Sequence, residues 1–189
     1  TTHLVYVTVV PGNRGGGGPA GPAIHYAFSV GNLTQVWSNT DWFSFGGMYP
    51  FGAVASGQSV FFPAGHNTNY ITAYYEATGH LQFTKSLFTN NGAPCGKWAP
   101  ALHNGSVYWS TEIGGIDGSA AVGAISASSG TSVWSNSFTK HDSDTQVDMV
   151  NWYPVVSADG TVIASPWNTN TGNTTFTASS ELQSLIWEY

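Results

Sequence analysis

The stretch Ala124-Ile-Ser-Ala-Ser-Ser-Gly130-Thr-Ser-Val-Trp134 has counterparts at three other places in the chain. Residues 73–83 keep the alanine, the glycine and the aromatic residue at the same spacing, in the form Ala73…Gly79…Phe83. Residues 27–37 keep the alanine and the tryptophan, and residues 177–187 keep the tryptophan. Self-similarity at a period of about 40–50 residues indicates a repeat architecture.

Each copy predicts several short strands. In the third copy, residues 100–103 and 106–111 flank Asn104-Gly105, a pair that is typical of two-residue β-hairpin turns. Residues 121–127 and 131–136 supply two further strands around a turn that contains Gly130. Apolar positions alternate in short runs and do not follow a helical period, which favours an all-β protein.

Four antiparallel strands per repeat predict a β-propeller. We expect a single propeller over residues 1–189, with four-stranded antiparallel blades at about 1–40, 41–88, 89–138 and 139–189. The first blade is incomplete, because it begins at its second strand, within residues 4–9.

The missing strand of the first blade has three explanations. No residues follow the last repeat to supply it, so the chain is expected to be a mature or excised segment of a longer propeller, or to be completed by a second chain. The third explanation is a three-stranded blade in a four-bladed ring.

One aromatic residue recurs in each repeat. Because an aromatic side chain buries a large area on a sheet, we expect these residues to fill the space between blades rather than to bind a ligand. The residues are Trp37, Phe83, Trp134 and Trp187.

The alanine, the glycine six residues later and the aromatic ten residues later together resemble the PQQ-like (quinoprotein) propeller repeat, which typically runs Ala-Leu-Asp-x-x-Thr-Gly-x-x-x-Trp. Residues 124–134 and 73–83 match it best, and Thr78-Gly79 keeps its Thr-Gly. The resemblance extends over all four copies and implies the fold. Proteins with such repeats include quinone-dependent dehydrogenases and non-enzymatic scaffolds and assembly factors.

The enzymes of that family hold pyrroloquinoline quinone and Ca²⁺, with a carboxylate base and often a vicinal cysteine pair. Cys95 is the only cysteine here, so that pair cannot form. No acidic residue stands at a first-strand position of several blades. We therefore expect no cofactor. The alternative is Ca²⁺ at the acidic cluster Asp142, Asp144 and Asp148, whose spacing can offer oxygen ligands.

Charge is scarce in this chain. Only 7% of residues are charged and the net charge is −6, whereas charged residues typically make up about 25%. With four basic residues the chain cannot neutralise nucleic-acid phosphates, and it has no apolar run long enough to insert into a membrane.

A surface this poor in charge is expected to carry glycans or to be covered in an assembly. Three Asn-x-Ser/Thr sequons fall in predicted turns, at Asn32, Asn104 and Asn173. No signal peptide is visible at Thr1, and we expect an extracellular or secreted location.

Tryptophan also recurs just ahead of Pro50, Pro100 and Pro154. We expect these tryptophans in the connections between blades, at one rim of the propeller, where they are binding candidates for a glycan or a protein partner. They are Trp42, Trp98 and Trp152.

The sequence contains no catalytic motif, and its six histidines lack zinc-binding spacing. The sequence therefore predicts a non-enzymatic extracellular binding or assembly module, glycosylated and part of a larger chain or oligomer. One alternative is a fragment of a quinoprotein-like dehydrogenase or glycan-processing enzyme. The other is a lectin, which a glycan array with Trp152→Ala would test.

Overall fold

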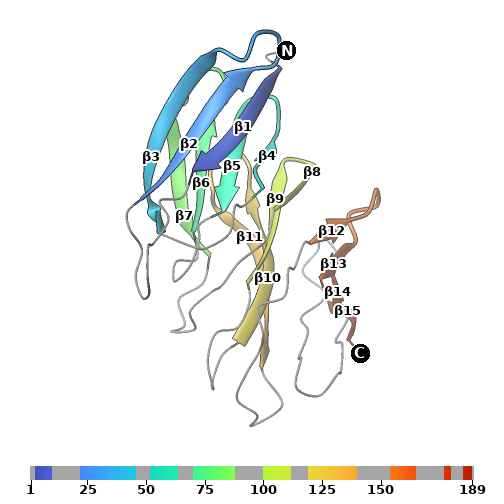
Figure 1. The fold of residues 1–189 in the computed structure, drawn as a ribbon. Helices are drawn as coiled ribbons and strands as arrows, with labels where there is room; N and C mark the ends of the chain where they lie inside the picture. Colours follow the sequence, from blue (N-terminus) through green and yellow to red (C-terminus); the bar gives the residue numbers. More distant parts are fainter. Residues whose placement is uncertain are drawn as a thin grey trace.

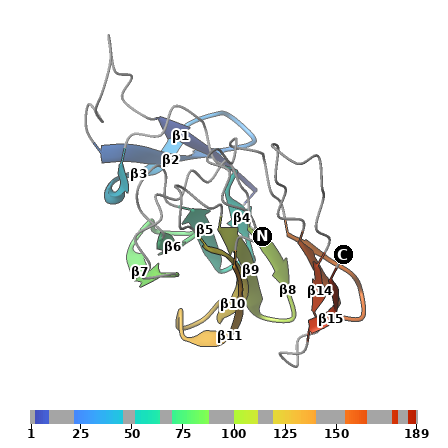
Figure 2. The same cartoon turned by 90° about the horizontal axis from the view of Figure 1, so that it is seen from below.

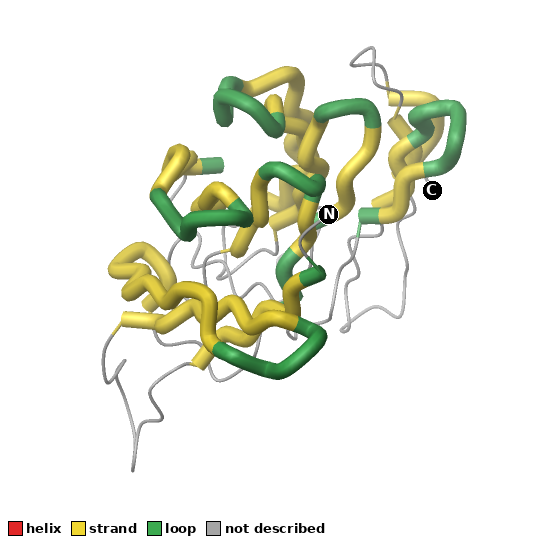
Figure 3. Tube along the Cα trace, turned by 90° about the horizontal axis from the view of Figure 1, so that it is seen from above, coloured by secondary structure: helices red, strands yellow, loops and turns green. Residues whose placement is uncertain are grey.

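The computed structural model describes residues 3–9, 22–45, 52–63, 70–87, 100–111, 119–139, 154–164, 177–179 and 185–188. Within these ranges the chain forms strands and turns and no helix (Figures 1 and 3). The strands are Leu4–Val9 (β1), Pro22–Ser29 (β2), Gln35–Phe45 (β3), Val54–Ala55 (β4), Ser59–Pro63 (β5), Tyr70–Tyr75 (β6), Leu81–Ser86 (β7), Ala101–His103 (β8), Ser106–Thr111 (β9), Ser119–Ser126 (β10), Ser132–Thr139 (β11), Val155–Val156 (β12), Val162–Ala164 (β13), Thr177–Ser179 (β14) and Leu185–Glu188 (β15).

The strands pair into four antiparallel sheets, each a meander in chain order. We call β1–β3 blade 1, β4–β7 blade 2, β8–β11 blade 3 and β12–β15 blade 4. Blade 1 has three strands and the others have four, which confirms the predicted propeller architecture and its incomplete first blade. Figure 2 shows the blades following one another around the molecule. The short first strands lie side by side, β4 next to β8 and β8 next to β12, and mark the inner side of the propeller.

One cross-strand pair is repeated in every blade. An alanine on the third strand of the repeat pairs with the aromatic residue on the fourth, and the register shifts directly after the alanine, as at a β-bulge. The pairs are Ala27–Trp37, Ala73–Phe83, Ala124–Trp134 and Ala178–Trp187. The last pair corrects the sequence alignment, which started the fourth copy at Thr177. Ala178 is the equivalent residue, so the hairpin of blade 4 is one residue shorter.

Turn glycines make these hairpins possible. Gly79 and Gly130 both have φ of +69°, a left-handed conformation that glycine adopts without steric cost. Each donates its N–H to the carbonyl four residues earlier, on Tyr75 and Ser126 respectively. The predicted Asn104-Gly105 turn is present as well, with both residues at positive φ.

The core consists of clusters between successive blades. Trp37 and Ala27 of blade 1 pack with Val60, Phe62 and Tyr74 of blade 2. Blades 2 and 3 share a second cluster of Phe61, Ile71, Ala73, Val107, Trp109 and Ile125, with Phe83 packed against it. Trp134 lies in a third cluster in blade 3 that reaches Val156 of blade 4. Three of the four recurring aromatics therefore fill inter-blade space as predicted, and the side chain of the fourth, Trp187, lies outside the described set.

The aromatic residue of one blade lies directly on the turn glycine of the next. A Cβ placed on Gly79 would be 2.7 Å from the ring of Trp37, and one on Gly130 would be 2.6 Å from the ring of Phe83. The indole Nε1–H of Trp37 also donates to the carbonyl of Glu76 at 2.8 Å. The glycines of the repeat are therefore required twice, by their positive φ and by the ring that covers them.

The position of Trp42 differs from the predicted one. It lies within β3, which continues to Phe45, and not in the connection that follows. The strand is extended because Phe45 still pairs with Pro22 of β2, beyond an irregularity in the register. Among the described residues, no helix could span a membrane.

Candidate functional site

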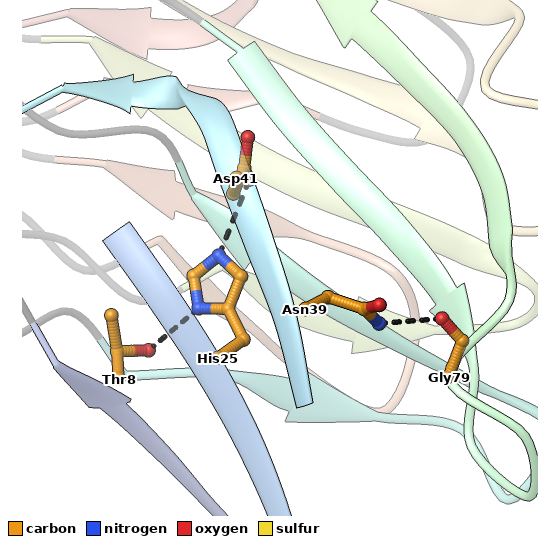
Figure 4. A network of polar contacts seen from close by, with 5 residues as sticks. All are labelled: Thr8, His25, Asn39, Asp41 and Gly79. Atoms are coloured by element: carbon orange, nitrogen blue, oxygen red, sulfur yellow. Dashed lines mark hydrogen bonds and ion pairs between the residues drawn. The ribbon is translucent and has the colours of Figure 1, made fainter. Parts of the chain in front are cut away.

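Blade 1 contains a buried chain of polar side chains. Thr8 Oγ1 lies 3.0 Å from His25 Nδ1, and His25 Nε2 lies 3.2 Å from Asp41 Oδ2 (Figure 4). The three residues come from β1, β2 and β3, and His25 and Asp41 are 1% and 2% exposed. Because a carboxylate only accepts hydrogen bonds, Nε2–H of His25 donates to Asp41. In the neutral ring, Nδ1 then accepts from the hydroxyl of Thr8.

Aromatic rings of blade 2 cover this chain. The imidazole of His25 stacks on Phe62 with ring centroids 3.9 Å apart, and Tyr74 lies 6.0 Å away. Burial, followed by the negative charge of Asp41, raises the pKa of Tyr74 well above its usual value of 10. On the same strand as Asp41, Asn39 Nδ2 donates to the carbonyl of Gly79 at 2.5 Å, which adds a polar contact between the blades (Figure 4).

The same positions are apolar in blade 2. Counted from the alanine–aromatic pair, Thr8, His25 and Asp41 correspond to Pro63, Ile71 and Leu87. Ile71 is fully buried and Leu87 packs against the same cluster. Blade 1 therefore has a chain of polar side chains where blade 2 has an apolar core. With both ring nitrogens engaged, His25 is a buried residue at the contact between blade 1 and blade 2.

A second buried carboxylate lies at the same interface. Glu76 of blade 2 is 5% exposed, and its Oε1 accepts the N–H of Gly57 at 2.6 Å. Burial and the nearby charge of Glu76 raise the pKa of Tyr6 on β1 above its usual range. Glu76 therefore holds the β4–β5 turn while its main chain receives the indole of Trp37.

The described carboxylates lie in different blades. Asp41, Glu76 and Asp159 belong to blades 1, 2 and 4. Asp159 lies in an exposed turn, where hydrogen bonds from Ser157 and Thr161 lower its pKa. Over the described ranges, no three side chains of the metal-binding types gather.

The sequence-predicted site residues are dispersed. Asn32 and Asn104 are exposed and lie in turns, whereas Asn173 lies outside the described residues. Of the rim tryptophans, only the backbone of Trp42 is described, and Trp98 and Trp152 lie outside the described ranges. The acidic cluster Asp142, Asp144 and Asp148, and Cys95, also lie outside them.

The most unusual surface of the described chain is one face of blade 1. Alternate residues of β1 point outward, and Val5, Val7 and Val9 are 43%, 41% and 46% exposed. Leu33 in the β2–β3 turn is 70% exposed, and Val36 on β3 adds to the apolar surface. Phe28 of β2 pairs with Val5 and is half-buried. We call Val5, Val7, Val9, Phe28 and Leu33 the open face.

No family profile and no curated protein sequence matches this chain. Solved structures do match. The quinohemoprotein alcohol dehydrogenase ADHIIG from Pseudomonas putida HK5 superposes with a TM-score of 0.65 at 12% identity, over 89% of this chain and 31% of its own. A europium-containing methanol dehydrogenase gives 0.64 at 16%, over 100% and 44%. BamB from Moraxella catarrhalis gives 0.55 at 15%, over 88% and 58%.

These similarities show the fold. The chain has the PQQ-like β-propeller fold, which agrees with the resemblance of its repeats. It spans less than two thirds of the length of each of these structures.

Sequence reasoning missed the Thr8–His25–Asp41 chain. A lone histidine within a strand carries no motif, and its partners come from other strands. Aligning the copies on their alanines would have found it, because His25 then falls in line with Ile71 and Val122, both apolar. The same alignment places Leu33 in line with Gly79 and Gly130.

Proposed function

We propose that this chain, a four-blade propeller segment, is a non-enzymatic binding or assembly module that uses the open face of blade 1. The exposure of Val5, Val7 and Val9 on one strand face carries the proposal. Contiguous exposed apolar surface favours a macromolecular contact. The low charge of the chain, 7% of residues, supports a surface that is covered in the working assembly.

The native mass of the secreted protein tests this function. We expect the protein to elute in a complex larger than the mass of its own full polypeptide chain. The double variant with Val5→Asp and Val7→Asp should dissociate from this complex, because a charge at either site opposes burial of the open face. Thr131→Asp, on an exposed turn of blade 3, is the control. A protein that behaves as a monomer in its native fluid would contradict the proposal.

The module is further proposed to be an extracellular glycoprotein. Asn32 and Asn104 are exposed on turns, where an attached glycan would meet no packed neighbour. Asn173 is the third proposed acceptor. Intact mass before and after glycosidase treatment tests this part, and no mass change in the secreted protein would remove it.

A second candidate is a segment of a quinoprotein-like dehydrogenase, favoured by the structural similarity to two such enzymes. Asp142, Asp144 and Asp148 are the carboxylates proposed for Ca²⁺ in that case. Titration with pyrroloquinoline quinone and Ca²⁺ distinguishes the candidates. Saturable cofactor absorbance, lost in Asp144→Asn, would favour the enzyme over the binding module.

A further inference from the structure

Blades 2 and 3 each have a face that receives the preceding blade. Its residues follow from register relative to the alanine–aromatic pair. Val60, Phe62 and Tyr74 form this face in blade 2, and Val107, Trp109 and Ile125 form it in blade 3. The equivalent residues of blade 1 are Val5, Val7 and Phe28, which belong to the open face. The open face is therefore the receiving face of blade 1.

Exposure shows that no described residue covers this face as blades 1 and 2 cover their neighbours. Val60 and Val107 are fully buried at 0%, because blades 1 and 2 cover them. Val5, the valine at the same position in blade 1, is 43% exposed. The hydrophobic pattern of a blade-to-blade interface thus continues onto a surface that no described residue covers.

The β2–β3 turn, which contains Leu33 of the open face, differs from the equivalent turns of blades 2 and 3. The N–H of Leu33 donates to the carbonyl of Ser29, and the N–H of Ser29 donates to the carbonyl of Thr34. The turns at Gly79 and Gly130 have the same two hydrogen bonds, so Leu33 occupies the glycine position. Leu33 keeps a left-handed φ of +56° although it carries a side chain, which an L-residue rarely does.

A side chain at this position changes what can dock. A Cβ on Gly79 or Gly130 would lie 2.7 or 2.6 Å from the ring of the preceding aromatic, closer than real Cβ contacts allow. Leu33 has this Cβ and three further carbon atoms. If another sheet docked on blade 1 with an aromatic side chain placed as Trp37 is placed on Gly79, that ring would therefore collide with the side chain of Leu33.

We propose that the open face binds a further antiparallel sheet of the same repeat type, in which a small residue replaces the docking aromatic. Leu33 fills the space that the ring would take and excludes sheets that carry the aromatic. Blade 4 of a second copy is among those excluded, because Trp187 stands at the docking register opposite Ala178. This inference rests on the proposed function and specifies the partner's chemistry.

Self-association of variants provides the test, because blade 4 can be converted into the stated partner. Trp187→Gly gives blade 4 a small docking residue, and we expect head-to-tail association of the variant at least about tenfold tighter than that of the wild type. Leu33→Gly should also associate, because Trp187 then meets a glycine. Sedimentation velocity of the 189-residue chain, deglycosylated throughout, measures both.

Controls decide the interpretation. Adding Val7→Asp to either variant should restore the monomer, because it places a charge in the contact. Circular dichroism checks that each variant is folded, and Trp187→Ala replaces Trp187→Gly if the latter unfolds. If the wild-type protein associates as strongly as the variants, Leu33 does not exclude sheets that carry the aromatic, and this part of the proposal is overturned. A Trp187 variant that is folded but monomeric would overturn the proposal that the partner sheet has a small residue at the docking position. It would do so even if native assembly still depends on Val5 and Val7.

Discussion

At the scale of single residues, two turn glycines of blade 3 differ in what covers them. Gly130 lies under the ring of Phe83, and Gly105, in the same blade, faces open space. Their φ values, +69° and +73°, are nearly the same. The pair therefore separates the cost of positive φ from the cost of a steric clash.

Gly130→Ala should destabilise the protein more than Gly105→Ala. Both alanines bear a strain of about 1 kcal/mol for left-handed φ. Only Gly130→Ala also overpacks the core, at a further cost of about 1–3 kcal/mol, because the new Cβ meets the ring of Phe83. Urea denaturation measures the difference, and equal costs would show that the close approach has no energetic effect.

His25 is a second residue whose substitution is informative. His25→Ala removes the hydrogen bond that His25 donates to the buried carboxylate of Asp41, which should cost about 1.5–3 kcal/mol. His25→Ile with Asp41→Leu restores the apolar residues of blade 2 and should be neutral or stabilising. Denaturation of the single and double variants tests this, and a double variant as unstable as His25→Ala would assign the polar chain a net stabilising role.

Tyr74 predicts an alkaline transition. Its pKa is raised in the folded state, so folding favours the neutral phenol. The associated stability is complete below the unfolded pKa of 10 and is lost as the pH rises above it. Tyr74→Phe should flatten the loss of thermal stability above that pH, and Tyr26→Phe serves as the control. An unchanged profile in Tyr74→Phe would contradict the burial argument.

At the scale of elements, the alanine–aromatic hairpin joins the blades. Trp37 donates its indole N–H to Glu76, whereas blade 2 has Phe83 at the same position and no such donor. Trp37→Phe should keep most of the ring packing and cost about 1 kcal/mol. Trp37→Ala should cost about 3–5 kcal/mol. Thermal unfolding checks both, and equal losses would mean that the hydrogen bond and the ring cannot be separated.

The sequence predicts these elements well where turns are explicit. Asn104-Gly105 places the hairpin of β8 and β9, and residues 106–111 form β9 as expected. The fourth copy was misaligned by one residue, because its turn lacks the glycine that fixes the register elsewhere. β3 also extends further than expected, since strand length depends on pairing with β2 and not on local pattern.

The site was less predictable than the fold. The three valines of the open face have the alternation of any half-buried strand, and only the structure shows that nothing described covers them. Likewise Asp41 appears in the sequence as an isolated acidic residue, and its pairing with His25 depends on the register of β2 and β3.

At the scale of the whole molecule, a single contact repeats along the propeller. The aromatic of blade 1 lies on the glycine of blade 2, and the aromatic of blade 2 on that of blade 3. Repeat proteins gain stability from such nearest-neighbour interfaces. Blade 1 has Leu33 at the position of these glycines, so the same contact cannot form there.

A double-mutant cycle at both joints tests this claim most directly. Trp37→Ala is combined with Gly79→Ala, and Phe83→Ala with Gly130→Ala, and urea denaturation gives the free energy of unfolding of each variant. We predict that each glycine-to-alanine cost falls, once the ring is removed, to that of Gly105→Ala. A cost that stays the same without the ring would contradict the account.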